Sequence, residues 1–211
     1  MTRVFLIRHG ETDWNRQQLF RGREDVPLNA NGVEQARVLS NAIPQQINAV
    51  YSSPLQRAHQ TASIIAAPRS IDVQLNDGFV DIDYGQWQRL SQEEVKSRFL
   101  ELYLMWISQP GRVVLPGGES LSEVRDRAFK SLCRIEDAHP GQTVAIVSHR
   151  VVNKVLLCAV LGLDDSQFWA IRQDTCAISS FEKDENRRVL TLLNETRHLK
   201  TLDTPHLTAD F

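Results

Sequence analysis

Residues 4–12 read Val4-Phe5-Leu6-Ile7-Arg8-His9-Gly10-Glu11-Thr12 and are among the most informative stretches of the chain. Four apolar residues in a row predict a buried strand, and an arginine and a histidine follow at its end. A second apolar run over 143–147 also leads into a histidine, in Ser148-His149-Arg150. Because ligands lie beyond the carboxyl ends of strands in parallel sheets, we expect both histidines to share one pocket.

The rest of the chain alternates between helical and strand-like apolar spacing. Helices are predicted over 33–43, 55–65, 91–107, 120–135 and 151–161, and further strands over 49–51, 71–75, 177–181 and 189–193. The polar, arginine-rich stretch 15–28 is predicted to be a functional loop. We therefore predict a single α/β domain over 1–211, a three-layer α/β/α sandwich with a mostly parallel central sheet and a C-terminal antiparallel hairpin.

Composition and charge narrow the classes of partner. The 211 residues carry 24 basic and 26 acidic side chains with no basic cluster, which argues against nucleic acid or an anionic membrane as the main partner. No apolar run approaches the ~20 residues of a membrane span, and the one before Arg8 is too short for a signal peptide. The three cysteines form no CxxC pair and predict reduced thiols. We expect a soluble, cytoplasmic protein.

A histidine beside an arginine at a strand end suits chemistry on a phosphate group. A neutral imidazole such as that of His9 can attack phosphorus, and water can then resolve the phosphohistidine. The guanidinium fork of an arginine such as Arg8 matches the phosphate oxygens. His149 precedes a predicted helix, whose first N–H groups favour an anion. This scheme requires no metal, and no cofactor is expected.

Further motifs follow these two in a fixed order. They are Asn15, Arg21-Gly22, Asp25-x-Pro27-Leu28, Ser52-Ser53-Pro54-Leu55-x-Arg57-Ala58-x-x-Thr61-Ala62, Asp83-Tyr84-Gly85-x-Trp87 and Gly117-Gly118-Glu119-Ser120. Together with the two histidine segments, this series resembles the histidine phosphatase superfamily, which includes cofactor-dependent phosphoglycerate mutases. The resemblance covers essentially the whole chain.

The resemblance implies a role for each matching residue. His9 would be the nucleophile and His149 the second phosphate-binding histidine. The other implied phosphate ligands are Arg8, Asn15 and Arg57. The loop cation Arg21 and its neighbour Gly22, which form one of the matching motifs, are further candidates for binding the substrate. Asp81 stands where most relatives carry a glutamate proton donor. An aspartate is one methylene shorter, and a misplacement of about 1 Å can cost on the order of 10²-fold in rate. Asp77 and Asp83 are weaker alternatives as donors.

Arg150 departs from the family pattern, because glycine is common at its position. Two interpretations stay open. In the first, its guanidinium binds a carboxylate or a second phosphate of the substrate. In the second, it is a surface arginine that caps local acids. Arg23 is another loop cation within reach of a substrate, and Glu11 is a candidate partner for a substrate ammonium. His198 is a candidate for closing the pocket. We interpret His59, His139 and His206 as surface histidines.

Three functions remain as hypotheses. The first is a metal-independent phosphomonoesterase that hydrolyses a small phosphorylated metabolite through a phosphohistidine on His9. The second is a phosphoglycerate mutase, and the third a non-catalytic phosphate sensor. Mutases of the family are generally longer after the Trp87 motif, so the short stretch 87–117 favours hydrolysis. Within the family, the chain looks most similar to metal-independent phosphoserine phosphatases. Sugar phosphates, phosphoglycerate and α-ribazole phosphate stay open as substrates, and a homodimer is a further hypothesis.

Overall fold

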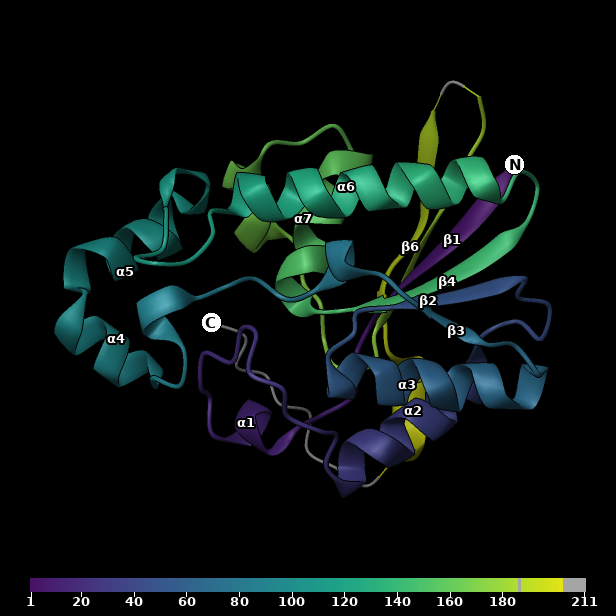
Figure 1. The fold of residues 1–211 in the computed structure, drawn as a ribbon, viewed down its shortest axis with the longest axis horizontal. Helices are drawn as coiled ribbons and strands as arrows, with labels where there is room; N and C mark the ends of the chain where they lie inside the picture. Colours follow the sequence, from purple (N-terminus) through teal and green to yellow (C-terminus); the bar gives the residue numbers. More distant parts are fainter. Residues whose placement is uncertain (186, 203–211) are drawn as a thin grey trace.

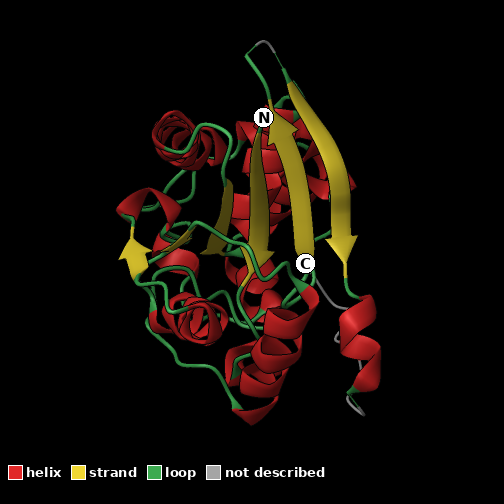
Figure 2. Cartoon of the chain, turned by 90° about the vertical axis from the view of Figure 1, so that its right-hand side faces the viewer, coloured by secondary structure: helices red, strands yellow, loops and turns green. Residues whose placement is uncertain are grey.

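A mixed six-stranded sheet forms the centre of the computed structural model, which describes residues 1–185 and 187–202. Its strand order is β3-β2-β4-β1-β5-β6. The bounds are β1 (Thr2–Arg8), β2 (Ala49–Ser52), β3 (Val73–Leu75), β4 (Thr143–Ser148), β5 (Ile178–Lys183) and β6 (Arg188–Glu195). The first four strands pair in parallel, whereas β5 runs antiparallel to both β1 and β6. Figure 2 shows the long strands side by side. The predicted sheet and C-terminal hairpin are confirmed.

Helices cover both faces of the sheet, so the three predicted layers are confirmed. The principal helices are α2 (Ala30–Ala42) and α3 (Gln56–Ala66) on one face and α6 (Leu121–Ala138) and α7 (Arg150–Val160) on the other (Figure 1). Strand β1 serves both layers because successive side chains alternate across a sheet. Val4 and Leu6 pack in the cluster with α6 and α7, and Phe5 and Ile7 in the cluster with α2 and α3.

The single helix predicted over 91–107 is wrong. The chain instead forms α4 (Gln92–Arg98) and α5 (Leu100–Ser108), which stand apart from the sheet in Figure 1. The break is at Phe99, whose backbone leaves helical geometry with φ −137° and ψ 41°. Its ring packs 6.2 Å from the buried Trp87 ring, so tertiary packing overrides the local helical pattern.

The predicted loop over 15–28 begins inside a short helix. This helix is α1 (Asp13–Arg16), which the Thr12 and Asn15 side chains cap reciprocally. The remaining short elements are 3₁₀ turns, η1 (Ala67–Arg69), η2 (Asp77–Phe79), η3 (Gly85–Trp87), η4 (Pro110–Arg112), η5 (Asp165–Ala170) and η6 (Arg197–Thr201). Within the described part of the chain, no helix has the length and apolar character that crossing a bilayer requires.

The strand register brings three chain segments to one edge of the sheet. Arg8 at the end of β1 lies opposite Ser148 at the end of β4. Ser52 at the end of β2 lies opposite Val147 on the other side of β4. The residues that follow these strands, His9, Ser53 and His149, therefore emerge next to one another.

Candidate active site

The two strand-end histidines lie together in the protein interior. Their ring centroids are 5.2 Å apart and the ring planes are inclined by 57°. The backbone N–H of His9 donates to the carbonyl of Ser148 over 3.0 Å, which ties the two segments together. Both side chains are buried. The structure thus brings His9 and His149 into one site, as the sequence predicts.

The hydrogen bonding of His9 defines which ring nitrogen is available for chemistry. Its Nδ1 lies 2.6 Å from the carbonyl oxygen of Gly10. Because a carbonyl only accepts, Nδ1 carries the proton and Nε2 keeps a lone pair. Among residues 1–185 and 187–202, this buried Nε2 has no hydrogen-bond partner. A neutral imidazole whose Nε2 lone pair is not engaged can act as a nucleophile.

Burial and nearby arginines keep both histidines neutral. The pKa of His9 is lowered well below its ordinary value of 6.5, first by burial and then by the charges of Arg57, Arg21 and Arg8. Burial, followed by the charge of Arg57, also lowers the pKa of His149. The neutral form that nucleophilic attack requires is therefore present well into the acidic range.

This protonation state predicts how stability depends on pH. Below pH 6.5 the unfolded chain binds protons at His9 and His149, whereas the folded protein does not. The free energy of unfolding therefore falls as pH falls. From pH 6.5 to about pH 5.5 the loss is roughly 1 kcal/mol for each histidine. Urea unfolding at both pH values measures this loss, and His149→Asn should flatten the pH slope. An unchanged slope in His149→Asn would contradict the assignment.

The ring of His149 is held by Ser53, a residue of the sequence motifs to which no role was assigned. It occupies the N-cap position of α7, and its Nε2 lies 2.8 Å from the Ser53 hydroxyl. Its Nδ1 lies 3.7 Å from Asp81 Oδ2. Ser53 therefore orients the ring so that its other nitrogen faces the carboxylate. The motif Ser52-Ser53-Pro54 after a strand was the available signal.

Arg57 is a fully buried cation at the start of α3. Its Nη1 donates to the carbonyl of Glu24 over 2.8 Å, and its Nη2 donates to the carbonyl of Gly22 over 2.8 Å and to Asp81 Oδ2 over 3.1 Å. Burial lowers the pKa of Arg57, and the Asp81 carboxylate opposes that effect. The loop over 22–24 thus holds the guanidinium in a fixed orientation.

Gly22 contributes backbone geometry to this arrangement. Its φ of +51° lies in the left-handed region, and an added Cβ would lie 2.8 Å from the carbonyl oxygen of Ile82. A larger residue at position 22 would have to move away from the Ile82 carbonyl. That movement would displace the carbonyl of residue 22 itself, which accepts from Arg57. Gly22 also lines the pocket described below.

Asp81 reaches the cluster although it is shorter than a glutamate. It is only 6% exposed, and its Oδ1 accepts from the Ile82 N–H over 3.0 Å while Oδ2 faces Arg57 and His149. The alternative donors lie elsewhere. Asp77 is exposed, and the Asp83 carboxylate accepts from the Gly85 N–H over 2.8 Å outside the pocket lining.

Sequence reasoning missed the residue that holds the Asp81 backbone. Arg127 on α6 donates to the carbonyls of Gly78, Val80 and Asp81 over 2.9, 2.7 and 3.2 Å, and Glu119 pairs with the same guanidinium. The signal was a charged residue next to the apolar stripe of α6, beside Ala128. This clamp brings the shorter acid toward Arg57.

A cleft next to this buried cluster is lined by most of the predicted substrate ligands. Asn15 is oriented by its helix cap, because its Oδ1 accepts from the Thr12 N–H and hydroxyl over 2.9 Å each and leaves the amide nitrogen for a ligand. The lining residues are Arg8, Trp14, Asn15, Gln18, Leu19, Phe20, Arg21, Gly22, Asp81, Tyr84, Arg150 and Val151. Arg57 and His149 lie buried beside Asp81, and His9 lies next to His149.

Several candidates lie away from this cleft. Arg23 forms ion pairs with Asp83 and Glu119 at 3.6 and 3.2 Å. The interpretation of Glu11 as an ammonium ligand is not supported, because its buried carboxylate accepts hydrogen bonds from Arg16, Asn29 and Asn31. The ring of His198 lies 3.1 Å from the Cys176 carbonyl and outside the cleft lining.

The predicted surface histidines have mixed outcomes. His59 is exposed, as expected. His139 is half-buried, with its Nε2 3.0 Å from the Tyr51 hydroxyl. His206 lies outside the described residues.

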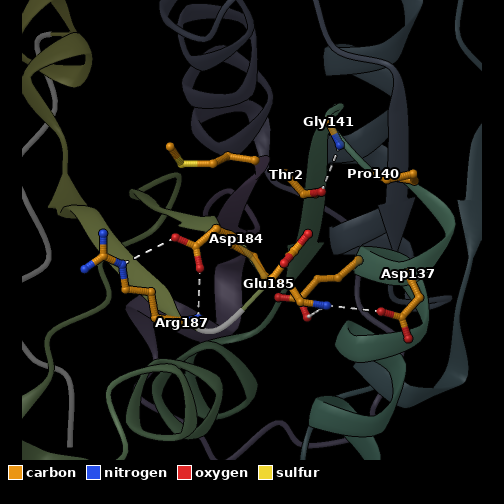
Figure 3. A pocket seen from close by; sticks show the side chains of 10 residues that line it. Thr2, Asp137, Pro140, Gly141, Asp184, Glu185 and Arg187 are labelled. Atoms are coloured by element: carbon orange, nitrogen blue, oxygen red, sulfur yellow. Dashed lines mark hydrogen bonds and ion pairs between the residues drawn. The ribbon is translucent and has the colours of Figure 1, made fainter.

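A larger hollow lies at the amino end of β1, at the opposite edge of the sheet (Figure 3). Several of its charged side chains pair with one another. Lys183 pairs with Asp137 at 3.1 Å, and Arg187 pairs with Asp184 at 3.4 Å. It contains none of the candidate phosphate ligands. The chemistry of the chain is therefore concentrated in the smaller cleft beside His9.

Comparison with known proteins agrees with this arrangement. A model of the histidine phosphatase superfamily (branch 1) matches residues 4–196. Phosphoserine phosphatase 1 of Hydrogenobacter thermophilus is 36% identical over 94% of this chain and 95% of that protein. The structure of YhfR from Bacillus stearothermophilus matches with a TM-score of 0.90 and 27% identity over 94% of this chain and 100% of that one. A mutant phosphoserine phosphatase of Entamoeba histolytica, solved in complex with phosphoserine, matches with a TM-score of 0.86 and 28% identity over 94% and 100% of the two chains. The chain therefore belongs to the histidine phosphatase superfamily and is a phosphatase.

Proposed function

We propose that this phosphatase hydrolyses a small phosphorylated metabolite without a metal ion, through a phosphohistidine on His9. The observation that carries the proposal is the buried Nε2 of His9, which keeps its lone pair and has no partner in the described part of the chain. Arginines, chiefly Arg57, dominate the charge around it. A neutral nucleophile surrounded by cations suits a phosphate dianion, since the cations neutralise the phosphoryl oxygens without competing for the lone pair.

In the first step, His9 Nε2 attacks phosphorus and the bond from phosphorus to the ester oxygen breaks. Arg8, Asn15 and Arg57 hold the phosphoryl oxygens, and His149 donates a hydrogen bond to them. A phosphate bound at Arg57 lies beside the Asp81 carboxyl group, which acts in its protonated form in this step. Asp81 gives this proton to the departing ester oxygen, so the product leaves as an alcohol.

In the second step, water replaces the alcohol in the cleft and attacks the phosphohistidine. Asp81, now a carboxylate, accepts a proton from this water. The bond from phosphorus to Nε2 breaks, inorganic phosphate forms and His9 returns to its neutral state. The same carboxyl group therefore serves as acid and then as base.

The names of two relatives favour phosphoserine as the substrate of this protein. The 36% identical protein is a phosphoserine phosphatase by name, and one of the matching structures holds phosphoserine. The cleft is lined by polar and charged side chains such as Asn15, Arg21 and Arg150, which suits a small, charged metabolite. We therefore propose phosphoserine as the first substrate to assay.

A substrate panel with EDTA present tests the proposal. We expect the wild type to release inorganic phosphate from phosphoserine in EDTA and to form an acid-labile, alkali-stable phosphoenzyme when ³²P-labelled substrate is quenched rapidly. Dependence on an added metal would overturn the metal-free scheme. Transfer of phosphate between the hydroxyls of phosphoglycerate in place of hydrolysis would instead identify a mutase. Binding of phosphoserine with no turnover on any substrate would identify a phosphate sensor.

A further inference from the structure

The cleft contains more positive charge than one phosphate group requires. Arg8 lines the cleft and Arg57 lies beside it, and these two cations suffice for a phosphoryl group. Arg21 and Arg150 line the same cleft. We propose that Arg21 and Arg150 form a second anionic subsite that binds a carboxylate on the alcohol portion of the substrate. This proposal rests on the proposed hydrolysis of a small phosphomonoester.

The position of Arg150 supports a substrate-binding role. It is the first residue of α7, directly after His149, and is therefore adjacent to the reacting centre in the chain. Its side chain lines the cleft together with that of Tyr84 and interacts with it electrostatically. Its guanidinium carbon lies 6.0 Å from the centre of the Trp169 ring. Two aromatic side chains from different elements thus hold the guanidinium at the cleft wall.

The aromatic supports are themselves fixed. The Trp169 indole N–H donates to the carbonyl of Trp106 over 2.7 Å, and the two rings meet edge to face with centroids 5.8 Å apart. Tyr84 is buried and packs against Phe20 and Trp106. A guanidinium held by rigid partners loses less conformational freedom when it binds an anion than a mobile surface arginine does. The geometry therefore favours a ligand role for Arg150 over that of a surface charge.

Arg21 contributes a buried donor to the same wall. Its Nε is buried and has no hydrogen-bond partner within residues 1–185 and 187–202. Burial, followed by the charges of Arg57 and Arg8, lowers the pKa of Arg21 to about 9, and Arg150 adds to this repulsion. An anion beside Arg21 and Arg150 would satisfy the donor and relieve the repulsion.

A carboxylate fits this pair of side chains. A guanidinium donates two parallel hydrogen bonds to the two oxygens of a planar carboxylate, which gives orientation as well as attraction. A second phosphate shares the negative charge, so substrates with either group must be compared. Because Arg150 follows His149, the carboxylate would lie close to the phosphoryl group, as in a compact phosphorylated hydroxy acid or amino acid.

Matched substrates test this inference. Phosphoserine and phosphoethanolamine differ by one carboxylate, and 3-phosphoglycerate carries a carboxylate where glycerol 3-phosphate carries a hydroxymethyl group. We expect the wild type to prefer the carboxylate-bearing member of each pair by about 10- to 100-fold in kcat/KM, the range expected for a hydrogen bond to a charged group. Arg150→Met and Arg21→Met should each reduce this ratio at least about threefold, and Arg150→Lys, which keeps the charge without the fork, should give an intermediate ratio. Arg98→Met on the surface of α4 is the control and should leave the ratio unchanged.

The possible results separate this inference from the proposed function. A ratio near one in the wild type, or wild-type ratios in both Arg150→Met and Arg21→Met, would overturn the carboxylate subsite while hydrolysis itself persists. A stronger Arg150 dependence for a bisphosphate than for phosphoserine would also overturn it, in favour of a second phosphate. Absence of turnover on all four substrates would instead be a failure of the proposed function. Thermal unfolding of each variant verifies that it is folded.

Discussion

His9→Ala should lose at least about 10⁴-fold of kcat for phosphomonoester hydrolysis, because removal of a nucleophile forces a different reaction path. The ring supplies a lone pair at Nε2 that no other described side chain replaces. Its neighbour His149 is engaged by Ser53 through Nε2, so it is not positioned to substitute. Release of inorganic phosphate from phosphoserine measures the loss. His59→Ala, at an exposed histidine on α3, is the matched control and should retain wild-type turnover.

The same variant should still bind its substrate. Arg57 is held by backbone carbonyls and by Asp81, and these hydrogen bonds do not involve His9. Titration calorimetry should therefore find phosphoserine affinity within about tenfold of the wild-type KM, with the fold intact by circular dichroism. Turnover within tenfold of the wild type would contradict the role of His9. Loss of both binding and folding would show that its contribution is structural.

Local patterns in the sequence predict the part of the site that adjacent residues build. Residues 4–7 and 143–147 are apolar, so they form neighbouring buried strands, and the histidines that follow must emerge at the same edge. The resemblance to the histidine phosphatases contributes Asn15 and Arg21 as motif residues and Asp81 at the donor position, and all three line one cleft. The meeting of the two histidine segments is predictable because strand direction determines it, whereas the roles of the individual site residues stay predictions.

Contacts between distant segments are what local patterns do not contain. Arg127 clamps the backbone of 78–81 from a helix more than 40 residues away, and no periodicity indicates that contact. The helix break at Phe99 depends on packing against Trp87. The Glu11 carboxylate accepts hydrogen bonds from Arg16, Asn29 and Asn31. The position of Glu11 in the motif does not reveal these partners. In each case a contact with a residue distant in sequence determines the structure or role, and the local sequence pattern does not indicate that contact.

Asp81→Asn should lose about 10²- to 10⁴-fold of kcat/KM for phosphoserine, the range expected when a positioned general acid is removed. An asparagine has the same shape and keeps an oxygen for the Ile82 N–H, but it cannot donate a proton to an alkoxide. The departing group makes the test specific. A serine alkoxide is a poor leaving group and needs a proton as the ester bond breaks. The phenolate of p-nitrophenyl phosphate leaves without one, so its kcat/KM should fall less than about tenfold.

The contrast between the two substrates separates proton donation from phosphate binding. Asp81 also accepts from Arg57 and lies near His149, so a change that merely disturbed these ligands would slow both substrates equally. Asp83→Asn is the matched control, because this carboxylate lies two residues away and outside the cleft lining. It should leave the ratio of the two substrates unchanged. Equal losses on both substrates in Asp81→Asn, or a leaving-group dependence in Asp83→Asn, would remove Asp81 from the role of acid. A selective loss confined to Asp81→Asn requires that the proton given to the ester oxygen comes from this carboxyl group.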